Sequence, residues 1–149
     1  MINPVEIFKA LGDETRLRLV NLLSQTNEDL CVCEMVDALE LPQYKISKHL
    51  TILKNAGLLQ GNREGTWVYY HLDGEASSFL RDLFKILGRH LGPVFTDDTV
   101  KLVQRLKLRE NGKCAVGFVA AAEITQTALR NNKRRKHVSK KARDFHLHA

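Results

Sequence analysis

Cysteine is scarce in this chain of 149 residues, which holds three: Cys31, Cys33 and Cys114. So small and odd a number does not suit a disulfide scaffold and favours reduced thiols in the cytoplasm. Also absent is any apolar run near the roughly 20 residues that a membrane-spanning helix needs. The first ten residues carry Glu6 and Lys9 in place of the apolar core of a signal peptide. We therefore expect a cytoplasmic protein with no membrane partner.

Acidic residues are nearly missing from the last twenty positions. Residues 130–149 hold eight lysines and arginines but a single acid, Asp144, whereas the rest of the chain holds 15 basic and 16 acidic side chains. The net charge of +6 therefore comes from this tail. Such a charge run predicts a disordered segment. It either adds sequence-independent DNA affinity through counterion release or is simply solvated.

Apolar residues recur at helical spacing through most of the remaining chain. The predicted helices cover residues 5–11, 13–23, 33–40, 43–56, 79–91 and 96–108. We expect Asp13 to be the N-cap of the second helix, and Thr96, Asp97 or Asp98 to be the N-cap of the last. Two runs rich in aromatic and β-branched residues, 58–63 and 66–72, predict strands that flank a hairpin turn at Glu64-Gly65.

The order of three helices, a short turn, a fourth helix and a hairpin is the pattern of a winged helix-turn-helix, a mainly α fold with one β-hairpin. We predict this domain over residues 1–110. A segment over residues 111–129 that carries Cys114 follows, and the basic tail over residues 130–149 ends the chain.

The predicted recognition helix, residues 43–56, has no carboxylate on its outward face. Lysines there can meet phosphates, while glutamine, serine and threonine can reach base edges in the major groove. The outward side chains that we assign to DNA contact are Gln43, Tyr44, Lys45, Ser47, Lys48, His49, Thr51 and Lys54. Arg63 near the hairpin tip would add a minor-groove or phosphate contact. The alternative is a charged face that is merely solvated.

Four sequence motifs occur in the order and spacing of a known family. They are Leu11-Gly12-Asp13-Glu14-Thr15-Arg16, Asp29-Leu30-Cys31-Val32-Cys33-Glu34, Lys45-Ile46-Ser47-Lys48-His49-Leu50 and Glu64-Gly65-Thr66-Trp67-Val68-Tyr69-Tyr70. On these motifs the chain resembles the ArsR/SmtB family of metal-responsive bacterial repressors over residues 5–110. The resemblance implies a homodimer through the first helix and the long helix after the wing. It also implies palindromic operator half-sites, release of operator DNA by an inducer, and no required cofactor.

The tripeptide Cys31-Val32-Cys33 supplies two soft ligands, which select trivalent arsenic or antimony, cadmium, lead, copper(I) or zinc. At a helix N-terminus, both thiols should have a lowered pKa. Helix positions i and i+2 lie about 200° apart, so binding of one ion by both sulfurs should distort the first turn of the supporting helix and disfavour the DNA-binding geometry. The alternatives are two small buried hydrophobic side chains or a strained disulfide switch.

The arsenic motif of the family that this chain resembles continues as Cys-x-Cys-x-x-Cys, but the third position here is Val36. Trivalent arsenic prefers three thiolates, so Cys114 is the candidate third ligand, from the same or the other subunit; otherwise it is an incidental cysteine. The family's cadmium and lead sensors add cysteines near the N-terminus, and none precedes Cys31 here. Its zinc site needs Asp-x-His where this chain has Asp82-Leu83-Phe84.

The sequence thus predicts a repressor that releases its operator when As(III) or Sb(III) binds cysteine thiolates. The alternative is the same fold sensing a divalent soft metal (Cd, Pb or Zn) or thiol oxidation. An enzyme is not expected. A thiol oxidoreductase would need a thioredoxin-like βαβ pattern around the cysteine pair or a general acid or base beside it, and the sequence offers neither.

Overall fold

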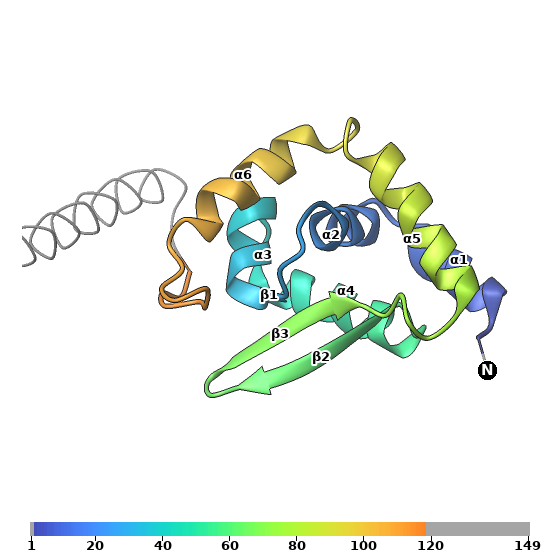
Figure 1. Cartoon of the computed structure of the whole chain (residues 1–149), viewed down its shortest axis with the longest axis horizontal. Helices are drawn as coiled ribbons and strands as arrows, with labels where there is room; N and C mark the ends of the chain where they lie inside the picture. The colour runs from blue at the N-terminus through green and yellow to red at the C-terminus, as the bar shows by residue number, and fades with distance from the viewer. Residues whose placement is uncertain (1, 119–149) are drawn as a thin grey trace, which may run out of the picture.

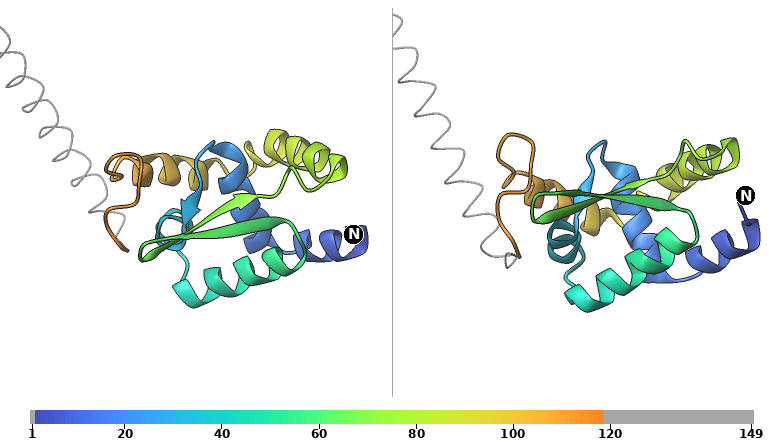
Figure 2. Two further views of the ribbon diagram at one scale, coloured as in Figure 1. Left: turned by 60° about the horizontal axis from the view of Figure 1, so that its bottom comes forward. Right: turned by 90° about the horizontal axis from the view of Figure 1, so that it is seen from below.

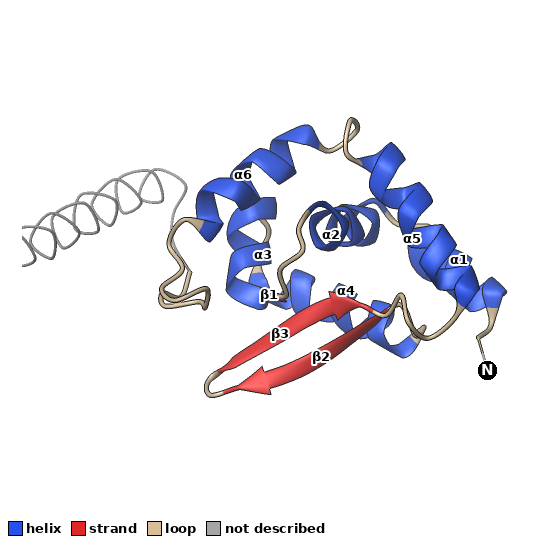
Figure 3. Ribbon diagram, in the orientation of Figure 1, coloured by secondary structure: helices blue, strands red, loops and turns tan. Residues whose placement is uncertain are grey.

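The computed structural model describes residues 2–118 of the chain. Within them, helices and strands follow each other in the predicted order, with one additional short strand (Figures 1 and 3). The elements are α1 (Pro4–Leu11), α2 (Glu14–Gln25), β1 (Leu30–Cys31), α3 (Val32–Leu39), α4 (Gln43–Asn55), β2 (Leu59–Glu64), β3 (Trp67–Leu72), α5 (Ser78–Leu91) and α6 (Thr96–Leu106). The predicted basic tail and residues 119–129 lie outside the described part.

Helix α2 lies at the centre of the fold (Figure 1). Asp13 caps it as predicted, because the carboxylate accepts the backbone N–H of Arg16 at 3.0 Å. The fully buried core side chains include Leu19, Val20 and Leu22 of α2, Ile46 and Leu53 of α4, and Leu80 of α5. No helix among residues 2–118 is both long and apolar enough to cross a membrane.

The sheet has three antiparallel strands in the order β1-β3-β2, and β1 was not predicted. Two residues of β1 pair with the middle of β3, in the register Leu30 with Tyr70 and Cys31 with Tyr69. Strands β2 and β3 form the hairpin, here called the wing. In the left view of Figure 2, α4 runs beside the wing on one side of the molecule, while α5 and α6 lie on the other.

The turn of the wing is shifted by one residue from its predicted place. Glu64 still pairs with Trp67, so the turn is formed by Gly65 and Thr66. Gly65 has φ of +60°, in the left-handed region that a tight hairpin turn requires. Arg63 is exposed next to this tip, as predicted.

The predicted last helix is present as α6, but its predicted cap is wrong. Phe95 occupies the N-cap position and makes no side-chain cap bond, while Asp98 accepts hydrogen bonds from Arg18 of α2 at 2.7 and 2.8 Å. Val100 and Val103 are exposed, whereas Leu102 and the charged Arg105 are buried. Part of the inner face of α6 is therefore occupied by ion-paired side chains in place of aliphatic ones.

Candidate functional site

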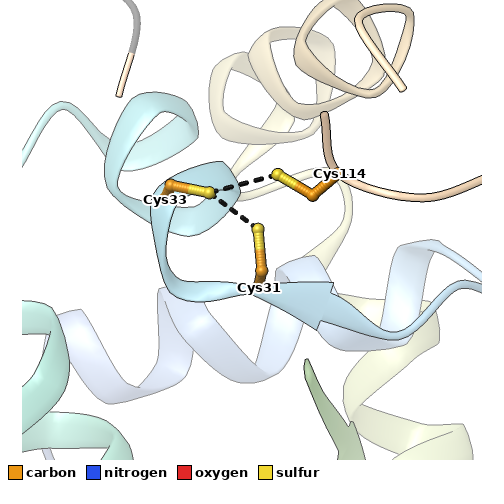
Figure 4. Close-up of side chains that lie close together, drawn as sticks. All are labelled: Cys31, Cys33 and Cys114. Carbon is orange, nitrogen blue, oxygen red and sulfur yellow. Dashed lines mark hydrogen bonds between the residues drawn. The ribbon is translucent and has the colours of Figure 1, made fainter. Parts of the chain in front are cut away.

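Three sulfur atoms from separate parts of the chain meet in one buried cluster (Figure 4). The Sγ atoms of Cys31 and Cys33 are 2.8 Å apart, and those of Cys33 and Cys114 are 3.3 Å apart. All three lie within 4.8 Å of one another. We call these residues the thiol cluster. Each of the three cysteines is reduced and buried, so the cluster is sealed from bulk water in this conformation.

The backbone around Cys31 explains why the first two sulfurs share a side. Cys31 ends β1 and is the N-cap of α3, with extended φ and ψ of −84° and 162°, while Cys33 lies in the first helical turn. Because Cys31 itself is extended, the separation of about 200° between helix positions i and i+2 does not apply to this pair. The prediction that one ion could bridge the pair only by distorting α3 is therefore wrong, because β1 already keeps Cys31 out of the helix.

Cys114 reaches the pair from the segment after α6 of the same chain. Glu110 and Lys113 form an isolated antiparallel bridge around a tight turn. Asn111 and Gly112 in that turn have φ of 51° and 74°, which reverses the chain direction. The turn directs Cys114 back towards α3, where its backbone N–H donates a hydrogen bond to the Tyr69 hydroxyl at 3.0 Å.

Two buried ion pairs join the end of α6 and the residues that follow it to α3. Arg105 Nε donates to Asp37 Oδ2 at 2.7 Å. Arg109 donates to both carboxylate oxygens of Glu34, at 2.7 and 2.8 Å, and Glu34 also accepts the backbone N–H of Cys31. Sequence reasoning missed these four residues. The sequence does contain a signal, because the two arginines are four residues apart and the two acids are three residues apart, so each pair has helical spacing.

Hydrogen bonding within the cluster separates the pKa values of the three thiols. The Cys31 and Cys33 thiols hydrogen-bond to Cys114 and lower its pKa, and the nearby Arg105 lowers it further. The hydrogen bond to Cys114 raises the pKa of Cys31 and of Cys33, and burial adds to both shifts. The prediction that the helix N-terminus lowers both pKa values of the pair is therefore wrong. The empty cluster stabilises a single thiolate, on Cys114.

The candidate nucleic-acid interface is the outer face of α4. Gln43, Tyr44, Lys48, Thr51 and Lys54 are exposed, and Lys45 and Ser47 are partly exposed. The absence of carboxylates on this face leaves a surface suited to phosphates and base edges. Arg63 on the wing is exposed as well.

His49 does not belong to this outer face, so its predicted orientation is wrong. It is buried, and its Nδ1 atom accepts a hydrogen bond from Arg16 Nη1 at 3.2 Å. Burial lowers the pKa of the imidazole, which keeps it in the neutral, accepting form. The reason is periodicity, because position 49 lies three residues after Ile46 and four before Leu53, on the core side.

Comparisons with known proteins agree with this architecture. Residues 13–60, from the cap of α2 into β2, match the family described as "Bacterial regulatory protein, arsR family". The arsenic resistance transcriptional regulator ArsR2 of Pseudomonas putida is 39% identical over 102 residues, which cover 68% of this chain and 88% of that protein. The arsenical resistance operon repressor of Escherichia coli is 51% identical over 69 residues, 46% of this chain and 58% of that repressor.

A metal-ion regulator and a solved structure are also similar. The cadmium resistance regulatory protein CadC homolog of Staphylococcus aureus is 42% identical over 76 residues, 49% of this chain and 62% of that protein. Reduced HlyU of Vibrio cholerae superposes with a TM-score of 0.51 at 31% identity, and the match covers 58% of this chain and 85% of HlyU. The chain thus shares its winged helix-turn-helix with transcriptional regulators that are named for arsenic resistance and for cadmium resistance.

Proposed function

The chain belongs to the ArsR family of bacterial regulatory proteins, as a DNA-binding transcriptional regulator, and we propose that trivalent arsenic or antimony is its inducer. The metalloid binds the thiolates of Cys31, Cys33 and Cys114, and the operator DNA is then released. The observation that carries this proposal is the convergence of three buried sulfurs within 4.8 Å. In the part of the chain that the structure describes, this is the group of candidate ligands that lies close enough to share an ion.

The number of sulfurs supports a trivalent metalloid. As(III) and Sb(III) are satisfied by three thiolates, whereas structural Zn(II) takes four ligands in a tetrahedron. The cluster offers three sulfurs. Soft thiolates also disfavour hard cations such as Mg²⁺ and Ca²⁺.

Charge balance supports the same choice. Arg105 with Asp37, and Arg109 with Glu34, are already two balanced ion pairs beside the cluster. Three thiolates around a trivalent ion form a neutral complex, while the same thiolates around a divalent ion leave one net negative charge. Binding of a trivalent ion therefore removes the negative charge that the Cys114 thiolate carries in the empty cluster, whereas a divalent ion leaves that charge buried, and burial of a charge is costly.

The release of DNA follows from where the cluster lies. Its sulfurs come from β1, which pairs with β3 of the wing, from the first turn of α3 and from the segment after α6. Helix α3 leads through Leu41-Pro42 into α4. Bonds from three sulfurs to one central ion set new distances between these parts. The loaded protein therefore favours a different position of α3 and the wing, and the population competent for DNA falls.

DNA binding requires a second copy of the chain. Large apolar side chains are exposed on α1 and α5, and Phe8 of α1 meets Phe79 of α5 edge-on, with ring centroids 6.3 Å apart. The exposed members are Val5, Phe8, Phe79 and Ile86. Such a patch favours burial against a partner, and a homodimer formed there would present two α4 helices to two palindromic half-sites.

The test is fluorescence anisotropy on labelled DNA from upstream of the protein's own gene. Protein is titrated at fixed salt, and arsenite, antimonite, cadmium, lead and zinc are then added separately. We expect release by arsenite and antimonite at low concentration, and weaker or no release by the divalent ions. Cys31→Ser, Cys33→Ser and Cys114→Ser should each bind the DNA normally but resist release.

Two outcomes would contradict the proposal. Release by cadmium or lead alone would assign the cluster to a divalent ion, as the similarity to the cadmium regulator would allow. Release that survives all three serine variants would remove the thiol cluster from the mechanism. A lack of preference for the upstream DNA over random DNA would instead contradict the operator-binding part.

A further inference from the structure

Arg105 is a charged side chain with none of its surface exposed, on the inner side of the last turn of α6. Burial of a charge is costly unless the charge is paired and hydrogen-bonded. The partners of this guanidinium therefore indicate what the buried charge holds together.

The guanidinium connects α3 to the segment that follows Cys114. On one edge of the guanidinium, Nε donates to Asp37 Oδ2 at 2.7 Å. Asp37 lies four residues after Cys33 in the same helix. On another edge, Nη2 donates to two consecutive carbonyls, those of Val116 at 2.9 Å and Gly117 at 2.7 Å. The rigid planar fork of arginine suits this task, because several donors in fixed directions reach separate acceptors at once.

The carbonyl of Val116 lies beside the sulfurs as well. Cys114 Sγ is 3.2 Å from this oxygen and Cys33 Sγ is 3.9 Å from it. The hydrogen bond from Arg105 therefore fixes a group that touches two of the three thiols. The Tyr69 hydroxyl also accepts the Cys114 N–H. Before Cys114, Arg109 donates to the Gly112 carbonyl, and Lys113 pairs with the exposed Glu64 and lies over the Tyr69 ring.

We propose that Arg105 is the positioning residue that completes the three-thiol site, because its fork holds residues 114–117 against α3 and so keeps the Cys114 sulfur beside the pair. The inference rests on the proposed function and deepens it. It makes the position of the third ligand, Cys114, depend on a buried arginine that does not itself contact the inducer. Without this fork, Cys31 and Cys33 remain in place through β1, and Cys114 leaves the site.

The test counts the thiols that arsenite protects from alkylation by N-ethylmaleimide, with mass spectrometry to identify each modified cysteine. We expect three protected thiols in the full-length wild-type protein. In Arg105→Lys we expect two, with Cys114 alkylated, and arsenite affinity lower by about tenfold or more. Arg18→Lys is the matched control, because it changes a partly buried arginine that also links α3 and α6, but through Asp98 and the Leu39 carbonyl and not through the segment of Cys114.

A double-mutant cycle separates positioning from general stability. If Arg105 acts through Cys114, arsenite affinity in Cys114→Ser should fall about as far as in Arg105→Lys, and the double variant should fall no further. Arg105→Gln, which is neutral, gives the same comparison if Arg105→Lys does not fold, as judged by circular dichroism. Three protected thiols in the Arg105 variants, or losses that multiply in the double variant, would overturn the inference.

The failure of the proposed function would be recognised separately. It would be seen in the wild-type protein, if arsenite protected no thiols or if arsenite protected the thiols without releasing DNA. Absence of protection in the wild type would overturn both proposals. Protection of three thiols in both wild type and Arg105 variants would overturn the role of Arg105 alone.

Discussion

The hydroxyl of Tyr69 lies 3.0 Å from the backbone nitrogen of Cys114, and this hydrogen bond joins the wing to the third thiol. Tyr69 is also the partner of Cys31 in the β1–β3 register. Lys113 adds a second link, because its ammonium lies 5.1 Å from the Tyr69 ring centroid and 2.7 Å from a carboxylate oxygen of Glu64. The thiol cluster is thus in contact with the wing as well as with the helix before α4.

Tyr69→Phe should weaken arsenite binding although all three cysteines remain in the protein. The change leaves the buried N–H of Cys114 without its acceptor, and a single neutral hydrogen bond is worth about 1 kcal/mol, or roughly fivefold in affinity. We expect arsenite to release DNA at about fivefold higher concentration, measured by anisotropy. Tyr70→Phe removes a hydroxyl from the next residue of β3, which faces the other side of the sheet, and should leave release unchanged. Equal release curves for the two variants would contradict the link.

The pH dependence of inducer binding should differ in sign between trivalent and divalent ions. The lowered pKa of Cys114 and the raised pKa values of Cys31 and Cys33 leave one thiolate and two thiols in the empty cluster near neutral pH. A divalent ion must displace the two thiol protons, so its affinity should rise by about 100-fold per pH unit. Arsenous acid brings three hydroxides, which leave as water after taking two thiol protons and one from solution. Its affinity should therefore fall by about tenfold per unit.

Titration calorimetry in buffers of different ionisation enthalpy measures these protons directly. We expect release of two protons for cadmium and uptake of one for arsenite at pH 7. Arsenite binding without net proton exchange would show that the cluster starts with three thiols, because three hydroxides and three thiol protons leave as three waters, and it would contradict the thiolate assigned to Cys114. Cys114→Ser is the control, because it removes the thiolate while keeping the pair.

Glu34→Gln should destabilise the fold strongly. Glu34 is fully buried, pairs with Arg109 and accepts the N–H of Cys31. Removing one partner of a buried ion pair costs about 3–5 kcal/mol, and the pair that Arg109 keeps with Glu28 is longer, at 3.3 Å, and involves an exposed carboxylate. Glu40→Gln is the matched control on the C-terminal side of α3, where the pair with Lys101 is exposed and worth about 1 kcal/mol or less. Urea unfolding of both variants measures the difference, and equal free energies of unfolding would contradict it.

The sequence predicts the helices and the wing well, because their apolar spacing, caps and turns are local. The Asp13 cap of α2 and the inward Ile46 and Leu53 of α4 are examples. It does not predict what depends on distant pairing. Strand β1 exists because two residues pair with β3, and this pairing, rather than any local propensity, turns the Cys31 sulfur towards Cys33.

The third thiol, Cys114, shows the same difference between what the local sequence predicts and what distant contacts determine. Cys114 is visible in the sequence as a candidate, but its position depends on Arg105 and Tyr69, which bond to it or to its neighbours from other elements. The pKa order of the thiols was wrong for the same reason. A helix N-terminus acts on nearby thiols in general, whereas the hydrogen bonds among the three sulfurs act more directly.

Lys48→Met tests the DNA face of α4. Lys48 is exposed on a surface without carboxylates. Loss of a phosphate contact there should weaken binding to all DNA sequences and reduce the slope of log affinity against log salt by about 1 per subunit, or about 2 for the homodimer. Lys85→Met on α5, also exposed, should change neither. Anisotropy titrations at several salt concentrations give both slopes. A loss confined to one DNA sequence would instead indicate that Lys48 reads a base.

Phe8→Glu should separate the two subunits of the proposed homodimer. Phe8 is 57% exposed on α1 and contacts Phe79 of α5, so a carboxylate here would be buried without a partner in an interface formed by these helices. Light scattering should show a monomer, and DNA affinity should fall because one half-site contact replaces two. Val103→Glu, at a similarly exposed valine on α6, is the control and should remain a dimer with normal affinity. If Phe8→Glu stays dimeric while Val103→Glu dissociates, the interface lies on α6 and the exposed apolar face of α1 has another role.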